Sequence, residues 1–132
     1  MDLDGFKAVN DQYGHDAGNY CLCQLASRMS SVLNDVDTVA RIGGDEFAII
    51  VIAPKDEEAV TNPAMRIIER VNSPIKVNGY KLHVGISIGI CFYPDDCDTM
   101  EELIKKADIA LYDAKSSGKN KVVLYNADTH YL

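Results

Sequence analysis

The sequence predicts an α+β fold in which helices flank a mostly antiparallel sheet. The chain has 132 residues, which is enough for one domain with a substantial core and too few for two. Segments with strand and helix patterns alternate in the order β-α-β-β-α-β, with hairpin signals between neighbouring strands. No internal repeat or linker divides the sequence, so we expect a single domain over residues 1–132.

The first elements expected are a short strand at Met1–Asp4 and a short helix at Phe6–Tyr13. Asp16 is then a plausible N-cap for a longer helix. Apolar residues at helical spacing predict the side of that helix that faces the core: Leu22, Leu25, Ala26, Met29 and Leu33.

Two apolar runs, Thr38–Ile42 and Phe47–Ile52, surround a Gly-Gly pair and predict a β-hairpin. The second run is apolar without alternation, which indicates a strand covered on both faces. A helix is expected between Asp56 and Asn72, and Pro63 should either kink it or lie in its first turn.

The last part of the chain predicts a second hairpin, a helix and a final strand. Asn78-Gly79 suits a type I′ turn, and Tyr80–Cys91 should form a long returning strand. Thr99 and Glu102 form a capping box before the helix. Gly118 stands where that helix should stop. Apolar residues at helical spacing predict the side of this helix that faces the core: Leu103, Ala107, Ala110, Leu111 and Ala114. The closing strand is expected at Lys121–Tyr125.

Composition excludes several classes of function. The net charge of −7 and the sequence pI near 4.8 argue against a broad basic face for nucleic acid. An anionic ligand would need metal ions and a few well-placed lysines. No apolar run is long enough to cross a bilayer, and the opening residues lack signal-peptide features. We therefore expect the cytoplasm, or the cytoplasmic portion of a larger membrane-anchored protein. The spacing of the four cysteines favours reduced, structural thiols.

The segment RIGGDEF, residues 41–47, is the most informative for chemistry. Gly43 and Gly44 leave the backbone bare at a hairpin tip, so that a phosphate can approach it closely. Asp45 and Glu46 follow at the rim of the strand. Hard carboxylate oxygens beside a phosphate site are what Mg²⁺ prefers. Taken alone, the segment is equally compatible with an ordinary turn followed by solvated acids.

A second acidic segment, DLDGFK, opens the chain. Asp2 and Asp4 alternate with Leu3, so their side chains should share one face of a strand. If this strand lies beside the hairpin, acids from both could converge on a metal, as in two-metal nucleotidyl-transfer sites. The alternative is an acidic pair in solvent.

Together these segments resemble the GGDEF family of diguanylate cyclases. The resemblance covers DLDGFKAVNDQYGHDAGN, RIGGDEF, SIGI at Ser87–Ile90 and ADIALYDAKSSGKNKV at Ala107–Val122, in that order. It implies a ferredoxin-like fold similar to nucleotide cyclases and the polymerase palm. It also implies a reaction in which a homodimer condenses two GTP into cyclic di-GMP and releases two pyrophosphates. Two Mg²⁺ ions per GTP site are implied as cofactors, with Mn²⁺ as an alternative.

The resemblance also implies roles for individual residues. Asp2, Asp45 and the Leu3 carbonyl match metal ligands. Glu46 matches the acid that helps the ribose 3′-hydroxyl lose its proton and also contacts a metal, so Asp45 and Glu46 are the catalytic pair.

The residues that match nucleotide contacts come from several elements. Phe6 and Lys7 offer backbone amides to the phosphates, beside the bare Gly43 and Gly44. Asn10 matches a contact to the guanine edge. Lys115 and Lys119 match cations that reach the terminal phosphates, although cations near a helix end are also favoured by the helix dipole alone.

Three departures from the family pattern stand out. Asn19 replaces the usual Asp of the second guanine contact, and Asn34 replaces the arginine of the product-binding R-x-x-D motif. The family's opening helix, its D-x-L-T-G-L segment and the start of its first strand are missing. Two alternatives therefore remain: a catalytically silent GTP-binding module, and a palm-like transferase for another nucleotide. GGDEF domains are usually fused to sensors, so a sensor or regulatory domain is expected in the full-length protein.

Overall fold

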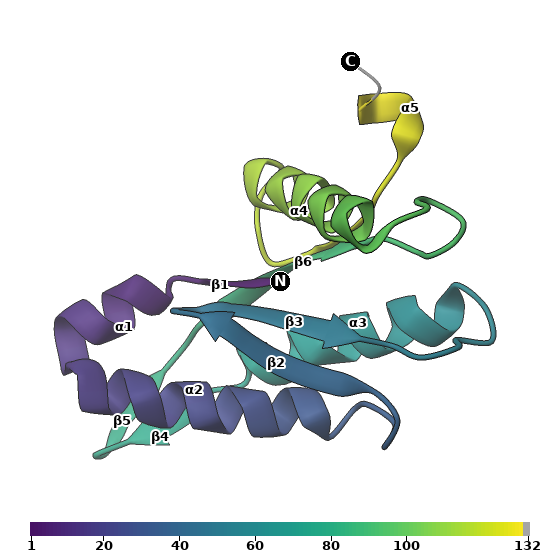
Figure 1. The fold of residues 1–132 in the computed structure, drawn as a ribbon. Helices are drawn as coiled ribbons and strands as arrows, with labels where there is room; N and C mark the ends of the chain where they lie inside the picture. The colour runs from purple at the N-terminus through teal and green to yellow at the C-terminus, as the bar shows by residue number, and fades with distance from the viewer. Residues whose placement is uncertain (131–132) are drawn as a thin grey trace.

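A five-stranded sheet forms the centre of the computed structural model, which describes residues 1–130 (Figure 1). The strand order is β2-β3-β1-β6-β7. Neighbouring strands are antiparallel except β6 and β7, which are parallel. The α+β, mostly antiparallel prediction is therefore confirmed. The strands are β1 (Asp2–Asp4), β2 (Thr38–Gly43), β3 (Glu46–Ile50), β6 (Gly85–Ile90) and β7 (Val122–Leu124).

Helices cover the sheet from both sides. Helices α2 and α3 lie on one face and α4 lies on the other, across β6 (Figure 1). A separate two-stranded sheet, β4 (Ile75–Val77) with β5 (Tyr80–Leu82), extends beside α2. The helices are α1 (Phe6–Tyr13), α2 (His15–Ser30), α3 (Glu58–Asn72), α4 (Met100–Ser116) and α5 (Ala127–His130).

The alternation of β6 explains how the two layers pack on the sheet. Ile86, Ile88 and Ile90 are buried in the main core cluster, whereas the intervening Ser87 and Gly89 face α4. A Cβ atom at Gly89 would lie 2.3 Å from the backbone of α4. Helix α4 therefore rests directly on the strand backbone, and only glycine leaves room for it.

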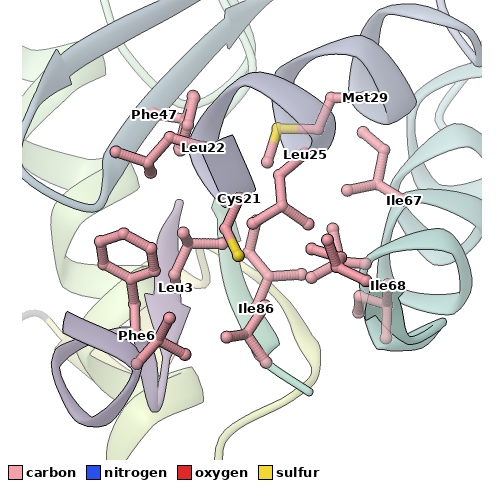
Figure 2. Packing of buried hydrophobic residues seen from close by; sticks show 14 of the residues in the cluster. Leu3, Phe6, Cys21, Leu22, Leu25, Met29, Phe47, Ile67, Ile68 and Ile86 are labelled. Carbon is pink, nitrogen blue, oxygen red and sulfur yellow. The ribbon is translucent and has the colours of Figure 1, made fainter. Parts of the chain in front are cut away.

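The main core lies between the sheet and the helices α2 and α3. Figure 2 shows Leu3 and Phe47 from the sheet packed with Leu22 and Leu25 of α2 and Ile67 of α3. Full burial of each such side chain contributes roughly 1.5–3 kcal/mol relative to exposure. The core therefore fixes β1 and β3 firmly, and these are the two strands that carry the acidic residues.

Several local predictions are confirmed. Asn78 and Gly79 both have positive φ, as a type I′ turn requires. Thr99 caps α4 by accepting a hydrogen bond from the N–H of Glu102 at 3.1 Å. Helix α4 ends before Gly118, whose φ of +126° lets the chain turn away.

The predicted Asp16 cap and the long stripe of α2 are partly wrong. Helix α2 begins at His15 directly after Gly14, so Asp16 lies in its first turn instead of capping it. A negative charge there still suits the helix dipole. The helix ends at Ser30, so Leu33 lies outside it, while Leu22, Leu25 and Met29 are buried as expected.

Two expectations about the middle of the chain need correction. Helix α3 starts at Glu58, so Pro63 lies inside the helix and the alternative that placed it in the first turn is wrong. Strand β3 is not covered on both faces along its length. Phe47 is buried, but the strand ends at Ile50, whose side chain is 59% exposed.

The long strand predicted at Tyr80–Cys91 is two strands. Leu82 ends the pairing with β4, and Gly85 begins the pairing with β1. At His83 and Val84 the chain leaves the two-stranded sheet, where β5 pairs with β4, and enters the five-stranded sheet, where β6 pairs with β1. A run of strand-forming residues does not reveal such an exchange.

The four cysteines are free thiols, as expected. Burial, followed by the neighbouring Cys97, raises the pKa of Cys91 to about 12, so this thiol stays protonated at neutral pH. Among residues 1–130 no helix combines the length and apolar content needed to cross a bilayer.

Candidate active site

The backbone brings the two acidic segments together at the centre of the sheet. Strand β1 runs between β3 and β6, with Asp2 opposite both Glu46 and Ser87. Directly paired residues point to the same face of a sheet, which here is the face covered by α4. The N–H of Leu3 donates to the carbonyl of Asp45 at 3.0 Å and holds the hairpin tip against β1.

The Gly-Gly turn is held open beside these acids. Gly44 has a φ of +54°, in the left-handed region that favours glycine. The Nε of Arg41 donates to the Gly44 carbonyl at 2.9 Å and braces the turn. A Cβ atom at Gly43 or Gly44 would meet nothing within 4 Å, so the backbone here is accessible to a ligand.

Asp2 and Asp45 form a crowded carboxylate pair. Burial raises the pKa of Asp2, Lys115 opposes this, and the neighbouring Asp45 carboxyl group raises it further. The Oδ1 atom of Asp2 is buried and has no hydrogen-bond partner. A buried oxygen without a partner is costly, and a bound cation would relieve both the repulsion and this cost.

The oxygens at this point fit a hard divalent cation. The Leu3 carbonyl lies beside Asp2 and already faces a cation, since Lys115 Nζ is 3.4 Å away. Carboxylate and carbonyl oxygens are the ligands that Mg²⁺ prefers. No cluster of three or more metal-ligating side chains is found in residues 1–130. The protein thus supplies two close carboxylates and a carbonyl, with Glu46 on the adjoining strand, and a nucleotide would supply further oxygens.

Lys115 and Asp4 make an ion pair that links α4 to β1. Lys115 Nζ lies 2.9 Å from Asp4 Oδ1 and 3.5 Å from Asp2 Oδ2. Burial alone would raise the pKa of Asp4, but hydrogen bonds from Lys115, Ser87 and the backbone of Asn120 lower it overall. Burial alone would lower the pKa of Lys115, but its contacts with Asp4 and Asp2 raise it overall. Both groups are therefore charged at neutral pH.

Ser87 and Asn120 belong to this network but were not among the predicted site residues. Ser87 opens SIGI, one of the segments that carry the resemblance, as a polar residue in an apolar run that faces the same side as Asp2. Asn120 lies in another of these segments, but it meets Asp4 through its backbone N–H, which residue identity does not reveal.

The remaining predicted phosphate contacts lie at the start of α1 and in the turn after α4. Phe6 and Lys7 form the first turn of α1, so their N–H groups have no carbonyl in the preceding turn to bond. Lys119 is exposed and has a φ of +64° in the turn after α4.

The two predicted base contacts come from the corner between α1 and α2. The side chain of Asn10 lies over Gly18, where a Cβ atom would be 1.8 Å from its Oδ1. Asn19 follows on the exposed side of α2. The absence of a side chain at Gly18 thus makes room for Asn10 beside Asn19.

A separate hollow of about 710 Å³ lies along the outer face of α4. Its lining includes Ile104, Lys105, Asp108 and Tyr112, and none of the predicted site residues. We place the candidate site at Asp2 and Asp45 instead. Their negative charge lies beside the accessible backbone of Gly43 and Gly44, and the Oδ1 atom of Asp2 has no hydrogen-bond partner.

The Asp37 position of the R-x-x-D pattern serves the local structure. Its carboxylate accepts hydrogen bonds from the N–H groups of Asn34 and Ile52, both at 3.1 Å. With Asn34 in the first position, this loop offers no guanidinium to a ligand.

Comparison with known proteins gives a consistent result. The family model described as "Diguanylate cyclase, GGDEF domain" matches residues 1–121. The chain is 42% identical over 120 residues to the bifunctional diguanylate cyclase/cyclic di-GMP phosphodiesterase MucR of Pseudomonas aeruginosa, covering 91% of this chain and 17% of MucR. It is 35% identical to diguanylate cyclase A of Treponema denticola, covering 94% of this chain and 33% of that protein.

A solved structure of a GGDEF domain has the same fold as this chain. A GGDEF-only form of TpbB (YfiN) from Pseudomonas aeruginosa superposes with a TM-score of 0.93 at 35% sequence identity. The match covers 98% of this chain and 77% of that one. The chain thus spans no more than about a third of the two curated relatives, and most of the solved domain.

Proposed function

Since this chain belongs to the GGDEF domain family of diguanylate cyclases, we propose that it condenses two GTP molecules into cyclic di-GMP and releases two pyrophosphates. The observation that carries the proposal is the pairing of Asp2 with Asp45 beside the bare Gly-Gly turn. The buried, unpartnered Oδ1 of Asp2 supports a bound cation at this point.

Asp2, Asp45 and the Leu3 carbonyl would hold Mg²⁺ in this proposal, with two ions per GTP site and Mn²⁺ as a substitute. When bound, the metal would offset phosphate charge and favour the ionised form of the attacking hydroxyl. Glu46, opposite Asp2 on β3, would accept the proton of the ribose 3′-hydroxyl. The 3′-oxygen then bonds to the α-phosphorus of the other GTP, and the bond from that phosphorus to pyrophosphate breaks.

The phosphates would lie between the hairpin turn, the first turn of α1 and the end of α4. The free N–H groups of Phe6 and Lys7 suit an anion, since helix N-termini favour negative charge. Gly43 and Gly44 allow close approach of the backbone. Lys115 and Lys119 would place positive charge beside the phosphates in a chain whose net charge is −7.

A homodimer is required by this chemistry. One domain offers one GTP site, whereas the product contains two symmetrical halves, so each of two subunits would present one GTP to the other.

Asn19 is the specific observation that favours a second candidate, a catalytically silent GTP-binding module. Asn19 and Asn10 would both contact the base. The amide of Asn19 accepts fewer hydrogen bonds from guanine than the carboxylate of an aspartate at the same position would. A palm-like transferase for another nucleotide is the third reading, and ATP competition separates it from the other two.

We also propose which further domains the full-length protein contains and where this domain is located. The curated relatives are several times longer than this chain, which supports a fused sensor or regulatory domain. Free cysteines are typical of reducing compartments, which supports a cytoplasmic location for this domain. No nucleic-acid partner is proposed for a chain this acidic.

The decisive experiment is incubation of the protein with GTP and Mg²⁺, with chromatographic identification of products. The proposal predicts one cyclic di-GMP and two pyrophosphates for every two GTP consumed. Tight GTP binding without product would support the silent module instead. A product formed from ATP in preference to GTP would support the third reading.

A further inference from the structure

Asp4 collects hydrogen bonds from three distant parts of the chain. Lys115 Nζ lies 2.9 Å from its Oδ1, and the backbone N–H of Asn120 donates to its Oδ2 at 3.0 Å. The Ser87 hydroxyl lies 2.8 Å from Oδ2 and 3.0 Å from Oδ1. Only 11% of the side chain is exposed. Both carboxylate oxygens are thus already occupied, unlike the unpartnered Oδ1 of Asp2.

The distances around Lys115 show which carboxylate holds it. Its Nζ is 2.9 Å from Asp4, but 3.5 Å from Asp2 and 3.4 Å from the Leu3 carbonyl. The two longer contacts are to residues proposed to hold a metal: Asp2, through its Oδ2, and the Leu3 carbonyl. When a cation binds to these two residues, Lys115 keeps its shortest contact, which is with Asp4. The Asp4 carboxylate also offsets the repulsion between the ammonium and the nearby metal charge.

The same carboxylate holds the turn that carries Lys119. Lys119 and Asn120 have φ values of +64° and +50°, in the left-handed region that asparagine tolerates but that is costly for lysine. The Asn120 N–H reaches both Asp4 and the Ser87 hydroxyl, the latter at 3.2 Å. These bonds stabilise a turn conformation that Lys119 would not favour alone.

We infer that Asp4 is a positioning residue for triphosphate binding, acting through Lys115 and Lys119. Its carboxylate fixes both cations at the end of the site that receives the terminal phosphates, and it does not itself contact the nucleotide. The inference rests on the proposed function, since it assumes that GTP binds beside Asp2 and Asp45.

The test compares two ligands that differ in their terminal phosphates. Calorimetric titration with Mg²⁺ would use 3′-deoxy-GTP, which lacks the attacking hydroxyl, and GMP. For Asp4→Asn we expect affinity for 3′-deoxy-GTP to fall roughly tenfold, since charge-assisted contacts are lost, and affinity for GMP to change by less than about twofold. Asp95→Asn, the same change at an exposed position, should alter neither affinity.

A double variant separates positioning from general destabilisation. If Asp4 acts through Lys115, then Asp4→Asn and Lys115→Met should give less than additive losses of 3′-deoxy-GTP affinity when combined. Additive losses would overturn the inference.

Circular dichroism would establish that each variant is folded. If Asp4→Asn does not fold, Asp4→Glu keeps the charge but displaces it, and it should also lower the ratio of 3′-deoxy-GTP to GMP affinity. An unchanged ratio in a folded Asp4 variant would overturn the inference while leaving the proposed function intact. A failure of the unmodified protein to bind 3′-deoxy-GTP would remove both.

Discussion

Gly89 on β6 lies directly beneath the backbone of Leu111 on α4, where a Cβ atom would come within 2.3 Å of the Leu111 nitrogen. This contact sets the distance between α4 and the sheet. Lys115 lies one turn further along the same helix, so the contact also determines where its ammonium meets Asp2 and Asp4.

Gly89→Ala should therefore destabilise the protein by about 1–3 kcal/mol, the usual cost of overpacking a tight contact. It should also weaken GTP binding, because α4 must move away and take Lys115 with it. Urea unfolding and GTP titration would measure both effects. As a control, Gly43→Ala adds a methyl group where nothing lies within 4 Å and should have little effect on stability. Equal stability of Gly89→Ala and the unmodified protein would contradict this packing.

The ion pair of Asp4 and Lys115 predicts a particular pH dependence of stability. The folded-state pKa of Asp4 is lowered, so its contribution is present above the unfolded pKa of about 3.9 and is lost as pH falls through the lower folded value. The pKa of Lys115 is raised, so its contribution is lost only as pH rises through a value above 10.5.

The measurement is the difference in unfolding free energy between the unmodified protein and Asp4→Asn, in chelator, from pH 3 to 9. The difference should be largest and flat from about pH 5 to 9 and should shrink below about pH 4. A difference that does not change between pH 3 and 7 would show that the charge of Asp4 contributes nothing.

Assembly gives a kinetic prediction. If two subunits each supply one GTP, product formation at low protein concentration should rise faster than linearly with concentration. The rate would be measured alongside the molecular mass by sedimentation. A strictly linear rate in the range where the protein is monomeric would rule out the dimer mechanism.

The amide at position 19 gives a prediction about base selectivity. Guanine presents two donors on one edge, which a carboxylate accepts together and an amide does not. The unfavourable contact costs about 1–3 kcal/mol. Asn19→Asp should therefore tighten GTP binding by roughly tenfold and sharpen discrimination against ATP. If Asn19 is only a residue of α2, calorimetry will show equal GTP affinities for both proteins.

The sequence predicts most of the fold because its signals are local. The alternation of Asp2, Leu3 and Asp4 correctly places the acids on one face of β1, and Asn78-Gly79 correctly predicts a hairpin. The exchange of partners at His83 and the exposure of Ile50 could not be predicted in this way, because they depend on which strand or helix lies alongside.

The residues of the candidate site could also be predicted only where a local motif carries them. Asp2, Asp45 and Glu46 were predicted to lie together because two motifs carry them, and the structure brings them together on the inner strand β1 and at the start of β3. The network of Asp4 was not predicted, because its partners lie 83, 111 and 116 residues away in sequence. One of those partners is a backbone N–H, which no residue identity reveals.

Cyclic di-GMP production by Asp45→Ala shows whether Asp2 and Asp45 together form the catalytic metal site. Asp45 lies at a hairpin tip that packs little, so its removal should leave the fold intact, as circular dichroism would verify. The matched control is Asp95→Ala on the exposed segment before α4. We expect Asp45→Ala to lose all measurable turnover with GTP and Mg²⁺ and Asp95→Ala to keep the activity of the unmodified protein. Near-normal turnover by Asp45→Ala, from a protein that is active to begin with, would contradict this assignment.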